Sequence, residues 1–263
     1  MLSIIVPVLN EAAALPALLV QLQHLRHQGC EVLMVDGGST DTSGALIQAA
    51  GLKLVHAPAG RARQMNAGAA QASCQVLLFL HADTELPPGA MDCVFEALGL
   101  VASSVSQPDV QSDMQSAPPK GAHRGHHKPM SSLRGEVSIG PHHCWGRFDV
   151  HITGQHWMLR PIARLMNLRS RYSGIATGDQ AMFMTRAAFE AAGGFPDQPL
   201  MEDIELSKRL LQRSRPACVR RCVHTSGRRW ETRGVWRTML LMWRLRWAYW
   251  RGVPADVLAR AYR

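Results

Sequence analysis

The first part of the chain alternates between short, continuous apolar runs and segments in which apolar residues recur with helical spacing. The continuous runs predict buried strands, and the segments between them predict helices. We expect strands at 2–9, 31–36, 52–56 and 76–80, with helices at 12–27, 42–50 and 62–71. Because short strands alternate with helices in this way, the pattern predicts an α/β fold built on a doubly wound, mainly parallel sheet.

The apolar run at 76–80 is the most informative of these strands. Its five consecutive large apolar residues indicate a strand buried on both faces, as in the interior of a parallel sheet. The strand leads into His81 and Asp83, where open α/β sheets bind their ligands. Asp83, with His81 two residues earlier, is therefore a candidate for holding a divalent cation. The alternative is that Asp83 only opens the turn at 84–85.

A second acid, Asp36, closes the strand at 31–36. Since parallel strands end at the same edge of a sheet, Asp36 and Asp83 are expected to face one nucleotide site. Asn10 and Glu11 follow the first strand, where a dinucleotide-binding protein would have its GxGxxG loop. The sequence also lacks a Walker A lysine motif, so the site is of neither of these two kinds.

Composition limits the class of protein. A length of 263 residues with 46% hydrophobic residues suits one large domain with a tail. The net charge of +9 at pH 7 indicates an anionic partner, which could be nucleotide phosphate, nucleic acid or an acidic lipid surface. The six cysteines form no CxxC pair, and we interpret them as reduced thiols of a cytoplasmic protein. We expect no membrane span, because no run approaches the ~20 apolar residues required.

Six segments resemble, in the expected order, the family 2 glycosyltransferases of the GT-A fold. They are IVPVLNE at 5–11, VDGGSTD at 35–41, HAD at 81–83, GDQAMF at 178–183, GGFP at 193–196 and MEDIEL at 201–206. The resemblance implies a GT-A domain over 1–230, with a nucleotide-sugar-binding half, followed by an amphipathic helical tail over 231–263. The segment at 60–66 and the end of the chain further resemble a bacterial subgroup named for its association with radical-SAM and selenium-related domains.

The resemblance implies a donor site at the ends of the first strands. Asp36 would accept a hydrogen bond from the pyrimidine ring or the ribose, whereas Arg61 and Arg63 would reach the diphosphate. The residues implied to bind the donor nucleotide are Pro7, Asn10, Glu11, Asp36, Arg61, Arg63 and Ala82. The alternatives are that Asp36 caps the next helix and that the two arginines belong to a solvated basic loop.

The segment at 81–83 takes the place of the family's DxD motif, in which acids bind a metal that bridges the donor phosphates. Asp83 keeps the metal-binding position, and Mg²⁺ or Mn²⁺ there would neutralise charge on the departing nucleoside diphosphate. His81 replaces the first acid. Since histidine suits Mn²⁺ better than Mg²⁺, His81 is either a ligand or a hydrogen-bond partner of a phosphate or a metal-bound water.

The acids at the start of the segment at 201–206 carry the implied catalysis. By resemblance Asp203 is the general base that takes the proton of the acceptor hydroxyl, and Glu202 orients Asp203 or binds the acceptor. Asp179 would line the acceptor side of the pocket. The alternative for the pair is a charged helix N-terminus, where acids are stabilised by the helix dipole.

The family's QxxRW signature is represented by SGRRW at 226–230, with Ser226 in place of glutamine. Arg229 would stabilise the leaving diphosphate, and Trp230 would stack on the acceptor. The missing glutamine argues against processive polymer synthesis. The chain between 101 and 143 breaks the pattern, and its low-complexity composition predicts a disordered insertion rather than a histidine-based metal site.

We therefore expect a metal-dependent, inverting glycosyltransferase that uses a nucleotide-diphosphate sugar and an unidentified acceptor hydroxyl, with a lipid-linked acceptor as one option. A sugar-phosphate nucleotidyltransferase is an alternative, although the glycine-rich phosphate loop expected after its first strand is absent. A non-enzymatic basic protein that binds nucleic acid is a second alternative, which salt-dependent binding without donor turnover would reveal. We expect no nucleic-acid partner.

The segment at 235–251 predicts a helix that lies on the inner face of the cell membrane. At about 100° per residue, one stripe is rich in tryptophan and is bordered by arginines. The stripe contains Trp236, Leu240, Trp243, Trp247 and Trp250. The opposite side, with Leu241, Met242, Leu245 and Tyr249, would pack on the catalytic domain. The alternative is that the tryptophan stripe faces the core or a dimer partner.

Overall fold

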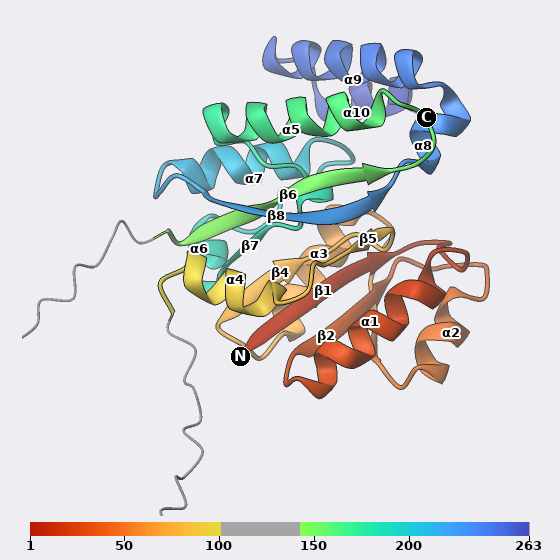
Figure 1. The fold of residues 1–263 in the computed structure, drawn as a ribbon, viewed down its shortest axis with the longest axis vertical. Helices are drawn as coiled ribbons and strands as arrows, with labels where there is room; N and C mark the ends of the chain where they lie inside the picture. Colours follow the sequence, from red (N-terminus) through yellow and green to blue (C-terminus); the bar gives the residue numbers. More distant parts are fainter. Residues whose placement is uncertain (101–142, 263) are drawn as a thin grey trace, which may run out of the picture.

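The computed structural model describes residues 1–100 and 143–262, which fold around one eight-stranded sheet (Figure 1). The strands lie in the order β3-β2-β1-β4-β7-β6-β8-β5. Their bounds are β1 Leu2–Val8, β2 Glu31–Asp36, β3 Lys53–His56, β4 Val76–Phe79, β5 Thr84–Glu85, β6 Trp145–Thr153, β7 Phe183–Thr185 and β8 Ala217–Ser226. The insertion expected at 101–143 lies outside the described residues, except for its last position.

The first half of the sheet is parallel, as predicted. Strand β1 pairs in parallel with β2 and β4, and β2 pairs in parallel with β3. Pro7 was expected near the end of the first strand, and in the structure it lies inside β1 opposite Val35. Because β4 pairs only with residues 2–5 of β1, proline at position 7 interrupts no ladder on that side.

The second half of the sheet is mixed. Strand β7 runs antiparallel to β4, β6 runs antiparallel to β7, and β8 lies parallel to β6. Strand β5 returns along β8 in the antiparallel direction, so the segment after β4 joins the far end of the sheet. This arrangement brings the residues that follow β4 close to the end of β8.

The helices cover both faces of the sheet. Their bounds are α1 Leu15–His27, α2 Ser43–Ala49, α3 Arg61–Gln71, α4 Ala90–Ala97, α5 Leu159–Ser173, α6 Arg186–Ala191, α7 Glu202–Leu211, α8 Arg228–Arg233, α9 Val235–Trp250 and α10 Ala255–Tyr262. The helices expected at 12–27, 42–50 and 62–71 correspond to α1, α2 and α3 with ends shifted by up to three residues. Helix α5 was not predicted, and it lies beside α9 (Figure 1).

The core has one hydrophobic cluster on each face of the sheet. Ile4 of β1 packs in the cluster that contains residues of α1, α2, α4 and α5, whereas Ile5 packs in the cluster that contains residues of α3, α6 and α7. Gly68 lets α3 approach β1 closely, because a Cβ atom there would collide with the Ile5 side chain. Alternating burial of this kind follows from the period of two residues along a strand.

The C-terminal helices form a third cluster with the start of α7. Leu245 of α9 and Leu258 of α10 are buried against Met201 and Ile204. The side of α9 with Leu245 therefore packs on the domain, as predicted, and the tryptophan stripe faces outward. No helix in the described part of the chain is long and apolar enough to cross a membrane.

Candidate active site

The loops after β1 and β2 are tied together by side chains at the edge of the sheet. The Oδ1 atom of Asn10 accepts a hydrogen bond of 2.8 Å from the Thr40 N–H, and the Asn10 N–H donates to Ser39 Oγ at 2.9 Å. The Glu11 N–H donates to Ser43 Oγ at 3.0 Å. Asn10 has a left-handed backbone (φ 55°), which asparagine tolerates better than most residues. This network fixes the walls of the expected donor site.

Asp36 is buried at the end of β2, and its carboxylate shapes the loop that follows. It accepts hydrogen bonds of 3.1 Å from the N–H groups of Gly38 and Ser39. The N–H of Ser43, the first residue of α2, donates instead to Asp41 Oδ1 at 2.9 Å. Asp36 therefore does not cap the next helix, and its role toward a donor stays a prediction.

Gln64 is a site residue that the sequence analysis missed. Its buried side-chain amide donates to the carbonyl oxygens of Val8 at 2.7 Å and of Val35 at 2.8 Å. These carbonyls belong to residues at the ends of β1 and β2, so Gln64 of α3 links the two strand ends. The available signal was a glutamine among the small residues of a predicted helix. A glutamine amide that becomes buried on such a face needs hydrogen-bond partners.

The two arginines of α3 point to different places. Arg63 Nε lies 2.8 Å from Asp197 Oδ1, so this exposed side chain is directed toward the loop before α7. Burial would lower the pKa of Arg61, but the carboxylates of Glu202 and Asp179 outweigh that effect and raise it. Arg61 is thus within electrostatic reach of these acids, whereas Arg63 is held by an ion pair at the surface.

His81 and Asp179 meet at the centre of the site. Nδ1 of His81 lies 3.2 Å from Asp179 Oδ1, and the His81 side chain is 9% exposed. The other side of the ring packs on Gly178, where an added Cβ atom would collide with it. Burial raises the pKa of Asp179, but the hydrogen bond from His81 and the positive charge of Arg61 lower it by more. The pKa of Asp179 therefore lies below its ordinary value.

The predicted catalytic pair begins α7. Asp203 accepts a hydrogen bond of 2.9 Å from the Gly178 N–H, which places it beside Asp179. Burial and the negative charge of Asp203 raise the pKa of Glu202. Burial also raises the pKa of Asp203, although the Gly178 and Ile204 N–H groups partly oppose this effect. A base with a raised pKa is suited to proton transfer near neutral pH.

Asp83 lies in a separate hollow of about 320 Å³ between the start of α1 and the β5–β8 edge. Its carbonyl oxygen accepts a hydrogen bond of 3.1 Å from the Ser226 N–H. Arg228 lines the same hollow, and its Nη2 atom lies 3.4 Å from Glu11 Oε2. Sequence reasoning named Arg229 and missed Arg228, which joins the C-terminal part of the chain to the loop after β1.

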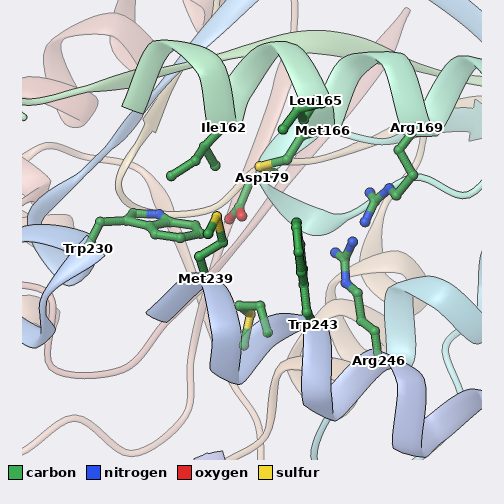
Figure 2. A pocket seen from close by; sticks show the side chains of 10 residues that line it. Ile162, Leu165, Met166, Arg169, Asp179, Trp230, Met239, Trp243 and Arg246 are labelled. Atoms are coloured by element: carbon green, nitrogen blue, oxygen red, sulfur yellow. The ribbon is translucent and has the colours of Figure 1, made fainter. Parts of the chain in front are cut away.

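Arg229 and Trp230 take different positions from Arg228. The Arg229 guanidinium lies 3.9 Å from the centre of the Tyr262 ring, where a cation–π interaction stabilises it. Trp230 lines a cavity of about 310 Å³ between α5 and α9, and Asp179 lies at the floor of this cavity (Figure 2). The structure thus brings together Asp179, Trp230 and the acids of α7, while Asp36 lies at the end of β2 and Asp83 follows β4.

The residues at the end of β4 fit a divalent cation only in part. Across residues 1–100 and 143–262, no group of three or more His, Cys, Asp or Glu side chains is arranged to hold a metal ion. Asp83 is half-buried and can supply one carboxylate, which leaves the other ligand positions to donor phosphates and water. His81 fits poorly as a ligand, because Asp179 and Gly178 occupy both sides of its ring.

Comparison with known proteins identifies the family. The sequence model of Glycosyl transferase family 2 matches residues 3–154, and the chain belongs to this family. The family predicted from the sequence motifs is thereby confirmed, whereas the radical-SAM-associated subgroup stays a prediction. No curated protein sequence matches the chain.

Solved structures are similar to this chain at low sequence identity. TarS 1–349 from S. aureus in complex with UDP has 16% identity and a TM-score of 0.57, and the match covers 86% of this chain and 60% of that one. The same fragment in complex with UDP-GlcNAc gives 14% identity and a TM-score of 0.55, over 86% and 58% of the two chains. A mannosyltransferase from Pyrobaculum calidifontis in complex with GDP-Man and Mn²⁺ has 17% identity and a TM-score of 0.49, over 85% and 56%.

The likeness to TarS confirms the predicted GT-A fold. The present chain spans about 60% of the length of the TarS fragment.

Proposed function

We propose that the protein is an inverting glycosyltransferase that moves a sugar from a nucleotide-diphosphate sugar to an acceptor hydroxyl. The observation that carries the proposal is the pair of acids at the start of α7, the buried Glu202 and the half-buried Asp203, whose raised pKa values suit a general base. The pair lies beside Asp179, which His81 links to the end of β4. Ligands of open α/β sheets bind at such strand ends.

In the proposed reaction, the acceptor oxygen forms a bond to the anomeric carbon from the face opposite the leaving group. The bond between that carbon and the diphosphate oxygen breaks, and its electron pair leaves with the nucleoside diphosphate. Asp203 takes the proton of the acceptor hydroxyl, while Glu202 keeps Asp203 oriented. Arg61, within electrostatic reach of these acids, is the cation placed to stabilise negative charge on the diphosphate.

The donor would bind along the loops after β1 and β2. The crossed hydrogen bonds of Asn10 with residues 39–40 support a preformed pocket there, because the loop needs little reorganisation. TarS has been solved with UDP and with UDP-GlcNAc, which supports a nucleotide-sugar donor for this chain. Asp83 is the residue that would hold Mn²⁺ or Mg²⁺. When bound, such a cation neutralises charge on the donor diphosphate.

Release of nucleoside diphosphate tests the proposed function. The purified full chain is incubated with uridine and guanosine diphosphate sugars and Mn²⁺, and donor binding is followed separately by thermal stabilisation. We expect one donor to stabilise the wild-type protein and Asp203→Asn equally, and Asp83→Ala much less. Release of pyrophosphate with a sugar phosphate and a nucleoside triphosphate would instead establish a nucleotidyltransferase.

We further propose that the outer face of α9 contacts an anionic membrane surface, which would give a lipid-linked acceptor access to the site. Support comes from the tryptophans of the stripe, all of which expose more than half of their side chains. Tryptophan next to arginine is typical of helices that lie in a lipid interface. The predicted localisation, at the inner face of the cell membrane, depends on this proposal.

A further inference from the structure

The cavity between α5 and α9 has an apolar wall on each side and two cations at one end. Ile162, Leu165 and Met166 of α5 face Met239 and Trp243 of α9 across it. Arg169 of α5 and Arg246 of α9 point toward one another beside the Trp243 ring (Figure 2). An apolar channel that ends in two guanidinium groups is complementary to a molecule with an apolar chain and an anionic group.

Arg169 has polar atoms that nothing in the described chain satisfies. Its Nε and Nη2 atoms are buried, and no described residue accepts a hydrogen bond from either. The negative charges of Asp203 and Asp179 favour the charged form of Arg169, but neither carboxylate accepts a hydrogen bond from it. Since arginine stays charged in proteins, these buried donors call for an acceptor such as a phosphate or carboxylate oxygen.

No carboxylate within residues 1–100 and 143–262 forms an ion pair with Arg169 or Arg246. Asp149 of β6 is already paired with both Arg147 and Arg171. Two cations that face each other repel, and their placement becomes favourable when an anion lies between them. The charge at the arginine end of the groove thus indicates an anionic ligand.

The mouth of the groove continues into an exposed apolar surface. Leu165 and Trp243 line the groove, yet they are 54% and 60% exposed, so they lie at its opening. One helical turn further along, Leu168 of α5 and Trp247 of α9 are also at least half exposed. An apolar surface at the mouth of an apolar groove favours a ligand that enters from a lipid layer over one that enters from water.

We propose that this groove is the acceptor site and that the acceptor is a membrane lipid whose anionic group binds between Arg169 and Arg246. The apolar chain would lie between α5 and α9 and leave through the opening at Leu165. Asp179 at the floor of the groove places the polar end of the lipid next to the catalytic acids. The inference rests on the proposed glycosyl transfer, and it names the class of acceptor.

Binding of decyl phosphate to the full chain, below its micelle concentration, tests the chemistry of the site. Decanol and inorganic phosphate serve as separate probes for the chain and the anion. We expect saturable binding of decyl phosphate and at least roughly tenfold weaker binding of the other two probes. Binding of decanol as tight as that of decyl phosphate would overturn the role of the arginines.

Matched variants separate the groove from general surface charge. Arg169→Gln and Arg246→Gln are expected to weaken decyl phosphate binding at least roughly tenfold, because each removes charge-assisted hydrogen bonds. Arg164→Gln on α5 and Arg244→Gln on α9 remove the same charge from exposed positions outside the groove and should change binding less than twofold. Equal losses in all four variants would overturn the proposal.

A second pair of variants tests the apolar wall independently of the arginines. Trp243→Ala should weaken binding of decyl phosphate, whereas Trp247→Ala should not, because Trp243 lines the groove and Trp247 does not. The lipid source is tested with phosphatidylcholine vesicles that contain phosphatidate, to which Arg169→Gln should bind more weakly than Arg164→Gln. A concentration-dependent dimer that Trp243→Ala dissociates would show that the groove belongs to an interface between copies, and would overturn the proposal.

Donor binding, measured on the same samples, keeps the two proposals apart. All four arginine variants should retain the thermal stabilisation by the donor that the wild-type protein shows. If decyl phosphate binds as expected and no donor binds, the groove stands and the proposed glycosyl transfer fails. If a donor binds and turns over while decyl phosphate does not bind, the glycosyl transfer stands and the acceptor class proposed here is wrong.

Discussion

His81 Nδ1 lies 3.2 Å from Asp179 Oδ1, a contact between residues 98 positions apart that links the segment after β4 to the segment between α5 and β7. A carboxylate can only accept in such a bond, so His81 donates its Nδ1 proton. The contact explains why histidine takes the place of the first acid of the motif at 81–83. An acid there would face the Asp179 carboxylate at hydrogen-bond distance.

His81→Asp is therefore expected to destabilise the protein. Two carboxylates at hydrogen-bond distance repel, and the Asp179 oxygen loses its donor, which together cost roughly 1–3 kcal/mol of unfolding free energy. His81→Asn keeps an N–H donor and should cost less. Urea unfolding in EDTA at pH 7 measures both variants. An aspartate variant as stable as the wild-type protein would show that His81 does not hold Asp179.

The pH profile of turnover tests the general base. Because burial raises the pKa of Asp203, the reactive carboxylate is lost at acid pH, and kcat/KM should rise with pH through a value above the ordinary carboxylate pKa of about 4. Asp203→Asn should lower kcat roughly 10²-fold or more and flatten this limb. Glu205→Gln is the control, since Glu205 pairs with Lys208 and Arg209 instead. Turnover of Asp203→Asn at the wild-type rate would exclude Asp203 as the base.

Glu202→Gln should stabilise the protein at neutral pH. A carboxyl group whose pKa is raised by folding contributes stability at low pH, and this contribution is lost as the pH rises through the folded-state value. At pH 7 the buried negative charge of Glu202 beside Asp203 thus lowers the unfolding free energy of the wild-type protein, and glutamine removes this charge. Chemical unfolding at pH 7 and pH 4 should show a gain at pH 7 that shrinks at pH 4. A gain of equal size at both values would exclude the charge as its cause.

The parallel half of the sheet could be predicted because its signals are local. Each strand is a continuous apolar run, and Asp36 and Asp83 stand directly after such runs, so the topology alone places both at one edge. The side of α9 that packs on the domain was predictable for a similar reason, since Leu245 and Trp243 fall on different sides of one helix. Patterns that repeat within one element need no knowledge of the remaining chain.

Helix α5 and its groove could not be predicted in this way. Leu159 of α5 is buried and Leu168, on the opposite side of the helix, is exposed, so apolar residues occur on two sides and the helical pattern is unclear. The partner of His81 and the buried position of Arg169 depend on contacts between distant segments. The sequence showed that a histidine replaces an acid, but only the fold shows which carboxylate that histidine serves.

Binding to vesicles tests the proposed membrane contact of α9. Trp247→Ser/Trp250→Ser removes two exposed side chains of the tryptophan stripe that lie outside the groove, and both are at positions where no core packing is lost. We expect the wild-type protein to float with anionic vesicles at low salt and the double variant to float much less, because each tryptophan contributes buried apolar area at the interface. Arg26→Gln, an exposed arginine of α1 on another part of the fold, serves as the charge control and should float like the wild-type protein. Raising the salt should weaken binding of both proteins, since attraction between exposed charges is screened. If neither protein floats with anionic vesicles at low salt, the tryptophan stripe does not contact a membrane.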